Sequence, residues 1–261
     1  MKRSVIQTPE LDNSINCFWS TGTSGASVLS LEYATQLAKL GRKTLLIDFD
    51  LIDPSLMIYL AMDDYPSGLQ AGLRLATQAR LDATNLNQLI VQSEDHKQLH
   101  LMAGVPVQGR FNSIETGSIT SLLVQLANWY DEIVLDLGNL HSQTINAKLF
   151  ELQAEAIQAS ENTYGVFRAD PEGIAKLFLK QAETSLIANF YRAGSLGAGG
   201  RKALKTVVQE NTGQSLLEII GEDDNLTAAI AKGISVGEVN RKSPISLAVK
   251  NLIQSRVDST H

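Results

Sequence analysis

Short apolar segments alternate with longer segments of helical spacing along most of this chain, and this alternation constrains the fold more than any other feature. The first example is the apolar run at residues 15–19, followed by helical spacing over residues 28–40 and a second apolar run at residues 43–47. Gly41 stands where a helix commonly ends in a glycine. A strand, a helix and a strand in this order predict the start of a parallel α/β sheet.

The same alternation continues to the end of the chain and predicts a three-layer, doubly wound α/β fold with a mostly parallel sheet. Further strands are expected at residues 99–103, 132–137, 164–167, 186–190 and 216–220. Helices are expected at residues 119–129, 145–159, 171–183, 201–210 and 245–257, and residues 86–91 look like part of a helix. We predict one domain over residues 15–257, with a polar lead at 1–14, a tail at 258–261 and a hinge candidate at 194–200.

Composition excludes several classes of protein. Of the 261 residues 44% are hydrophobic and 19% charged, which suits a globular domain with a full core. No run of about 18 apolar residues predicts a membrane span, and the start of the chain lacks the apolar centre of a signal peptide, so we expect a cytoplasmic protein. The net charge of −6 argues against a mainly electrostatic nucleic-acid binder, and the single cysteine excludes an internal disulfide.

A glycine-containing turn, STGTSGAS at residues 20–27, lies between the first strand and the first helix. Gly22 and Gly25 would let the backbone approach a phosphate, and the free N–H groups of the helix N-terminus favour an anion. Ser27 could cap the helix or bind magnesium. A Walker P-loop requires lysine where Ala26 stands, and the glycine spacing does not satisfy G-x-G-x-x-G. A tight turn without a ligand is therefore an open alternative.

The turn and the sequence that follows it, ATQLAKLGRKTLLIDFDLIDPSL, resemble the start of the ParA/MinD family of P-loop ATPases. WYDEIVLDLGN is similar to the family's Walker B strand, LIANFYRAGSLGAGG to its strand with a base-contacting Asn, and residues 222–252 to its closing segment. The resemblance covers residues 15–257 and implies a P-loop NTPase fold. It is strongest with the CpaE/TadZ-like branch, in which P-loop lysines are often replaced.

The resemblance implies a site for ATP and Mg²⁺. Asp50 would help to position attacking water, and Asn189 would contact the adenine. The magnesium ligands, direct or through water, would be Ser27, Asp48 and Asp136. The phosphates would be held by the loop residues Gly22, Thr23, Ser24, Gly25, Ala26 and Ser27.

Two departures from the family pattern bear on activity. Thr21 stands in the place of the family's signature lysine, and Ala26 in that of the Walker lysine. Each lost charge-assisted contact to phosphate costs about 1.5–3 kcal/mol, so we expect weak nucleotide binding with little or no hydrolysis. Arg42 and Lys43 are too far from the loop to substitute, at the other end of the helix and strand.

The function that follows from the resemblance is a homodimeric positional or assembly factor, placed at a pole or septum, with partners from a pilus or a partition/septum system. An active ATPase of the same family is one alternative. The other is an NAD(P)-binding oxidoreductase in which Asp48 holds the ribose.

Structural readings of the same residues also stay open. Asp48 and Asp50 could cap a helix in residues 54–60, and Asn189 could be a strand-end residue without a ligand. The last helix carries an apolar face, for which packing is favoured over peripheral membrane contact. That face consists of Ile245, Val249, Leu252 and Ile253. The basic cluster at residues 192–205 is expected to be a solvated face rather than a DNA-binding patch.

Overall fold

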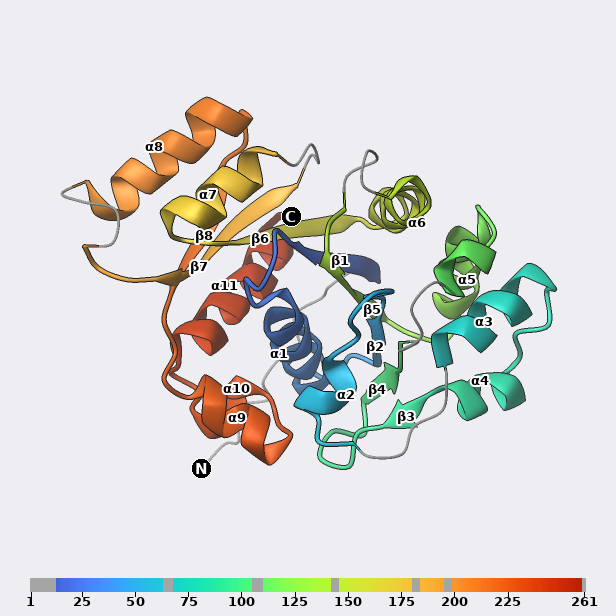
Figure 1. Ribbon diagram of the computed structural model, residues 1–261. Helices are drawn as coiled ribbons and strands as arrows, with labels where there is room; N and C mark the ends of the chain where they lie inside the picture. The colour runs from blue at the N-terminus through green and yellow to red at the C-terminus, as the bar shows by residue number, and fades with distance from the viewer. Residues whose placement is uncertain are drawn as a thin grey trace, which may run out of the picture.

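One sheet organises the chain, and a computed structural model describes it over residues 13–62, 68–104, 110–141, 146–179, 184–194 and 199–259 (Figure 1). Its strands are β1 (Ser14–Ser20), β2 (Thr44–Asp48), β3 (Val91–Gln92), β4 (Leu99–Met102), β5 (Glu132–Asn139), β6 (Asn162–Arg168), β7 (Ser185–Tyr191) and β8 (Leu216–Gly221). Their order is β3-β4-β2-β5-β1-β6-β7-β8. Neighbouring strands are parallel, except that β3 runs antiparallel to β4.

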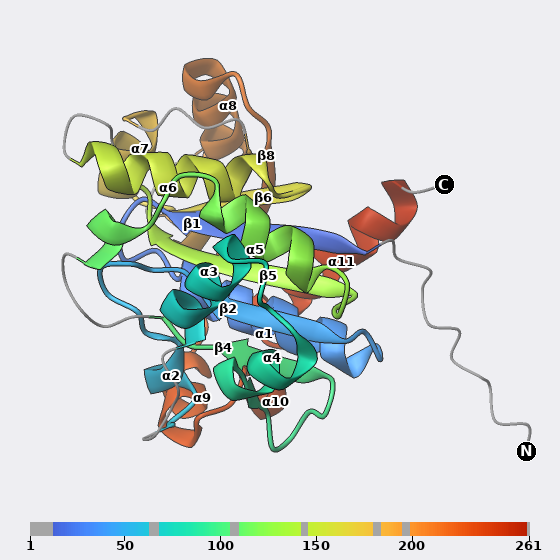
Figure 2. The same ribbon diagram turned by 90° about the vertical axis from the view of Figure 1, so that its right-hand side faces the viewer.

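Helices cover both faces of this sheet, which confirms the predicted three-layer α/β fold. One face carries α3 (Gly68–Thr77), α4 (Ala83–Leu89), the 3₁₀ helix η1 (Arg110–Ser113), α5 (Ser118–Leu126), α6 (Ala147–Gln158), α7 (Pro171–Phe178) and α8 (Gly200–Thr212). The other carries α1 (Ala26–Lys39), α2 (Leu56–Tyr59), α9 (Leu226–Lys232), α10 (Val236–Val239) and α11 (Pro244–Ser259). Figure 2 shows α3, α5 and α6 lying across the first face.

The central strand β1 shows how the sequence builds two cores at once. Successive side chains of a strand point to opposite faces. Trp19 therefore packs on the first face, against the bare backbone of Gly165, where an added Cβ would lie 2.5 Å from the indole. Phe18 packs on the second face, with its ring 5.3 Å from that of Tyr33 and 4.8 Å from that of Tyr164. The same apolar run thus contributes to both layers.

Helix α11 packs against α1 and β8, as expected for a helix that closes the domain. Its predicted apolar face is buried, so that face is not available to a membrane; the buried residues are Ile245, Val249, Leu252 and Ile253. At the other end of the helix, Arg256 pairs with the fully buried Glu132 at 3.1 Å. Within the part of the chain that is described, no helix has the length and apolar character needed to cross a membrane.

Several boundaries differ from the predicted ones. The helix expected over residues 86–91 ends at Leu89, because Ile90 is extended and the next two residues pair with β4 as an edge strand. The helix expected to reach residue 129 ends at Leu126. Helix α7 begins at Pro171 as predicted, and its expected end at residue 183 lies outside the described residues. So do residues 1–12 of the lead, residue 145, residues 195–198 of the hinge candidate, and the last two residues of the tail.

Candidate functional site

The glycine turn forms the connection from β1 to α1 at the carboxyl-terminal edge of the sheet. Gly22 has φ of 133° and Gly25 has φ of 88°, values that favour glycine. Gly25 is the N-cap of α1, and no described side chain caps this helix end. The first N–H groups of a helix have no partner inside it, and its dipole is positive at this end. The turn is therefore built to attract an anion.

The turn is held by the two strands beyond β1. The Ser24 hydroxyl donates to the carbonyl oxygen of Val166 at 2.7 Å. Asn189 Nδ2, from β7, donates to the carbonyl oxygen of Ser24 at 2.9 Å, and its Oδ1 accepts from the Phe190 amide. An added Cβ on Gly25 would lie 2.7 Å from this Nδ2. Asn189 thus positions the turn, and its contact with adenine stays a prediction.

Two carboxylates lie beside the turn on neighbouring strands. Asp48 ends β2 and faces Asp136 of β5 in register, and both side chains are fully buried. Asp48 accepts hydrogen bonds from the amides of Leu56, at 3.0 Å, and Asp50, at 3.3 Å. It thereby caps the start of α2, which matches its structural reading. A buried carboxylate committed to backbone amides is poorly placed to bind a ribose, so the geometry does not favour the oxidoreductase alternative.

Asp50 lies just beyond β2 and bends the chain. Its Oδ1 accepts from the amides of Ile52 and Asp53 at 2.9 Å each. Its other oxygen lies against Gly138 of β5, where an added Cβ would come within 1.8 Å of it. Burial raises the pKa of Asp50 above the ordinary value. The structure therefore gathers Asp50 with Asp48 and Asp136, the three carboxylates that the sequence resemblance assigns to one site.

Asp136 has an oxygen without a described partner. Its Oδ1 accepts from the Gly138 amide at 3.2 Å, whereas its buried Oδ2 makes no hydrogen bond of ordinary geometry to any described residue. Burial raises the pKa of Asp136 to about 7; the nearby Ser27 hydroxyl and the Gly138 amide oppose this rise, and the Asp50 charge adds to it. Burial, followed by the charge of Asp136, also raises the pKa of Asp48. A buried charge of this kind needs a proton or a cation.

The donors at this edge fit a hydrated magnesium ion. Mg²⁺ prefers oxygen ligands, keeps several waters and takes one or two carboxylates together with phosphate oxygens. The orphaned Oδ2 of Asp136 and the hydroxyl of Ser27 are such oxygens. No three His, Cys, Asp or Glu side chains in the described ranges form a complete metal cage. The phosphate of a ligand would have to supply the remaining contacts.

Two cationic side chains lie near the turn, and neither was among the site residues predicted from the sequence. Arg168, after Val166 in β6, and Lys176 of α7 line a cavity of about 240 Å³ together with the turn; the other lining residues are Thr21, Gly22, Thr23, Ser24, Asp170, Glu172 and Gly173. The sequence did carry one indication of them: a helix is expected to start at Pro171, directly after a strand expected to run parallel to β1, so its first residues could be placed at the same edge of the sheet as the turn. Arg42 instead pairs with Glu132 at the start of β5, at the opposite edge, as expected.

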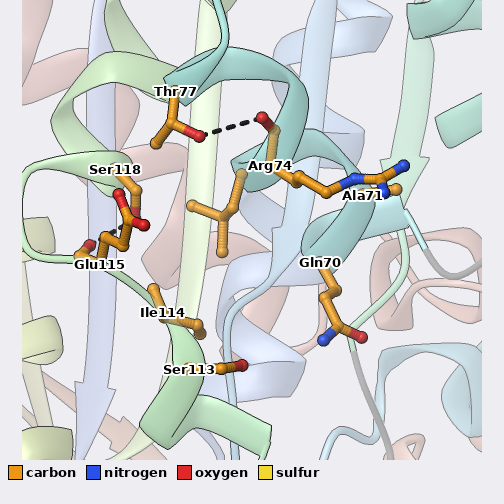
Figure 3. A pocket seen from close by; sticks show the side chains of 9 residues that line it. Gln70, Ala71, Arg74, Thr77, Ser113, Ile114, Glu115 and Ser118 are labelled. Carbon is orange, nitrogen blue, oxygen red and sulfur yellow. Dashed lines mark hydrogen bonds between the residues drawn. The ribbon is translucent and has the colours of Figure 1, made fainter.

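A second cavity, of about 370 Å³, lies on the first helical face (Figure 3). Helix α3 lines it with Gln70 and Arg74, and the segment from η1 to α5 lines it with Ser113 and Glu115. No residue of the turn or of the carboxylate group lines this cavity. Although it is larger, the positive helix end and the buried carboxylates make the turn the better candidate site.

Comparisons with known proteins identify the fold. No family model matches the chain, and no curated protein matches it significantly. Solved structures do. A ParA family ATPase from Chlorobium tepidum superposes with a TM-score of 0.73 at 17% identity, covering 92% of this chain and 98% of the other. The septum site-determining protein MinD from Pyrococcus horikoshii, complexed with Mg-ADP, gives 0.69 at 19% identity, with 92% and 94% covered.

A third solved structure is the MinC:MinD cell division complex of Aquifex aeolicus, with a TM-score of 0.68 at 18% identity and coverage of 92% and 96%. These likenesses extend over nearly the whole of both chains. The eight-stranded order with helices on both faces is thus the α/β fold of ParA- and MinD-type P-loop proteins.

Proposed function

We propose that this chain binds a magnesium nucleotide at the glycine turn and acts as a positional or assembly factor of the ParA/MinD type. The observation that carries the proposal is the buried Oδ2 of Asp136, which has no hydrogen-bond partner among the described residues, beside the N-terminus of α1, which no described side chain caps. An anion alone would suit the helix end and repel the carboxylates. A magnesium ion with a polyphosphate satisfies both, because the ion takes the carboxylate side and the phosphates take the helix side.

Each residue has a distinct part in this proposal. The backbone N–H groups from Gly22 to Ser27 hold the phosphates, for which the Ser24 amide has to release its present acceptor, the Gly22 carbonyl oxygen. The Ser27 hydroxyl and Asp136 hold the ion, directly or through water, and Asp48 braces α2 beside it. Asp50 orients a water molecule toward the terminal phosphate. When bound, Mg²⁺ offsets the negative charge of the phosphate oxygens.

We further propose that hydrolysis is weak or absent. Phosphoryl transfer depends on positive charge around the transferred group, and a P-loop lysine usually supplies part of it. Thr21 and Ala26 supply none. The active ATPase of the same family remains the competing possibility, and an assay of turnover decides between them.

The proposed cellular role rests on the fold and on the sequence resemblance to the CpaE/TadZ-like branch. The MinD of Aquifex aeolicus is seen with the protein MinC. By analogy, we propose a cytoplasmic homodimer that recruits protein partners of a pilus or a partition/septum system to a pole or septum. No part of this proposal requires nucleic acid or a membrane.

Calorimetric titration with ATP and with ADP, each in the presence of Mg²⁺, tests the proposal. We expect saturable binding by the wild-type protein, loss of binding in Asp136→Ala, and little release of phosphate over hours. Light scattering with and without Mg-ATP reports the dimer. Absence of binding at millimolar nucleotide would overturn the proposal of a nucleotide site. Sustained magnesium-dependent release of phosphate would overturn the proposal that hydrolysis is weak or absent.

A further inference from the structure

Lys176 reaches the glycine turn from a distant part of the chain. The cavity of about 240 Å³ is lined by residues 21–24 of the turn, by Arg168 at the end of β6, by Asp170, and by residues of α7 that include Lys176 in its last turn. The ammonium nitrogen of Lys176 lies 3.8 Å from the point where a Cβ on Gly22 would stand. This nitrogen therefore lies close to the turn. Gly22 directly follows Thr21, which stands where the family that the sequence resembles has its signature lysine.

The other cation of this cavity, Arg168, is already committed. Its Nε donates to Asp170 Oδ2 at 2.8 Å, and its guanidinium lies 5.1 Å from the centre of the Phe190 ring. Asp170 is itself held in place, because its Oδ1 caps α7 by accepting from the Gly173 amide at 2.8 Å. The charge of Arg168 is thus already compensated by a carboxylate that the N-terminus of α7 holds in place.

Lys176 is held much more loosely. Its ammonium pairs with Glu172 at 2.7 Å, one helical turn earlier in α7. The Glu172 side chain is 77% exposed and that of Lys176 is 50% exposed. Exposed pairs of this spacing contribute little to stability, because water competes for both charges. Lys176 can therefore exchange this carboxylate for a more highly charged partner at little cost.

We infer that Lys176 supplies to a phosphate chain at the turn the positive charge that Thr21 and Ala26 do not, and that Glu172 is its partner when no phosphate is bound. This inference rests on the proposed function, because it adds a residue to the same site. A polyphosphate carries several charges, and a lysine bond to it is charge-assisted and stronger than a neutral one. Nucleoside triphosphates and free tripolyphosphate share this charged phosphate chain.

The test compares binding of Mg-ATP by matched charge variants. We expect Lys176→Met to weaken binding about 10- to 100-fold, the loss of one charge-assisted contact, and Lys176→Arg to keep most of the affinity. Glu172→Gln should tighten binding by about two- to fivefold, because it frees the lysine from an exposed ion pair. The control is Lys148→Met in α6, which removes a lysine paired with Glu151 on the same helix and should change nothing.

A parallel titration with magnesium tripolyphosphate separates this inference from the proposed function. If Asp136→Ala abolishes ATP binding while Lys176→Met and Lys148→Met bind ATP with equal affinity, the role of Lys176 is overturned and the nucleotide proposal stands. Binding of tripolyphosphate that depends on Lys176, without binding of ATP, would support the role of Lys176 and overturn the nucleotide proposal. Binding of neither compound would overturn both.

Discussion

The carboxylates of Asp48 and Asp136 are buried opposite each other on neighbouring parallel strands, at the edge of the sheet that carries the glycine turn. Asp48 is satisfied by backbone amides, whereas Asp136 keeps an oxygen without a described partner. This asymmetry assigns them different parts. Asp48 maintains the local backbone, and Asp136 is available to a cation.

The first prediction concerns the stability of the ligand-free protein. The pKa of Asp136 is raised to about 7, so between pH 4 and 7 the folded protein keeps a proton that the unfolded chain releases. Stability should therefore fall as pH rises through this range, and the full penalty applies above it. Asp136→Asn should raise the unfolding temperature at pH 8 by several degrees, since about 1 kcal/mol corresponds to roughly 2–4 °C in a domain of this size.

Thermal unfolding at pH 4 and pH 8 checks this prediction. The advantage of the Asn variant should shrink toward pH 4, where the wild-type carboxyl is protonated in the folded state. An equal or lower unfolding temperature of the variant at pH 8 would show that Asp136 carries no unpaired charge.

The second prediction restores a lysine to the turn. Ala26, the first residue of α1, is nearly buried beside the proposed phosphate position. Ala26→Lys should tighten Mg-ATP binding about tenfold or more, because it adds a charge-assisted contact to phosphate. Ala26→Met has a similar length and no charge, and should not tighten binding. Equal affinities of the two variants would place the phosphates elsewhere.

The third prediction separates backbone strain from a clash at Gly25. Gly25 and Gly41 flank α1 with φ of 88° and 84°, but an added Cβ meets Asn189 Nδ2 at 2.7 Å in the first case and nothing within 4 Å in the second. Gly41→Ala should cost about 1 kcal/mol, the price of left-handed backbone for alanine. Gly25→Ala should cost more and should also abolish nucleotide binding, because it displaces the turn.

Urea unfolding and nucleotide titration of both alanine variants measure these effects. If Gly25→Ala lowered the free energy of unfolding no more than Gly41→Ala does, the hydrogen bond from Asn189 to the Ser24 carbonyl oxygen would not determine the shape of the turn.

The fourth prediction concerns the opposite edge of the sheet. Glu132 is fully buried and accepts from the guanidinium groups of both Arg42 and Arg256 at 3.1 Å. Removal of one partner from a buried ion pair costs about 3–5 kcal/mol, so Glu132→Gln should lower the free energy of unfolding by about 3 kcal/mol. Affinity for Mg-ATP should not change in protein that remains folded. A selective loss of affinity would contradict the assignment of this network to the scaffold.

Periodicity was enough to predict seven of the eight described strands and most helices, because buried runs such as residues 15–19 and 132–137 have few other stable solutions. It failed where an element depends on contacts with its neighbours and not on its own pattern. The edge strand β3 has only two residues and depends on its pairing with β4. Helix α3 was missed; it contains Gly68 and Gly72, which have low helical propensity, and Gly68 lies tight against the backbone of Leu89.

The candidate site was predictable in part for the same reason. Asp48, Asp50 and Asp136 follow or end apolar runs, so their meeting at one edge of a parallel sheet could be predicted. Lys176 could not be found in this way, because its distance from the turn depends on how β6 and α7 are placed beside β1. The bond from Asn189 to Ser24 likewise joins residues that are 165 positions apart.

Amide hydrogen exchange with and without Mg-ATP tests the central claim most directly, because it locates the ligand as well as detecting it. The account predicts slower exchange in peptides covering residues 20–30 and the end of β5. Peptides lining the cavity between α3 and α5 should not change, and they serve as an internal control (Figure 3). Unchanged exchange at the glycine turn at millimolar Mg-ATP would contradict a nucleotide site there.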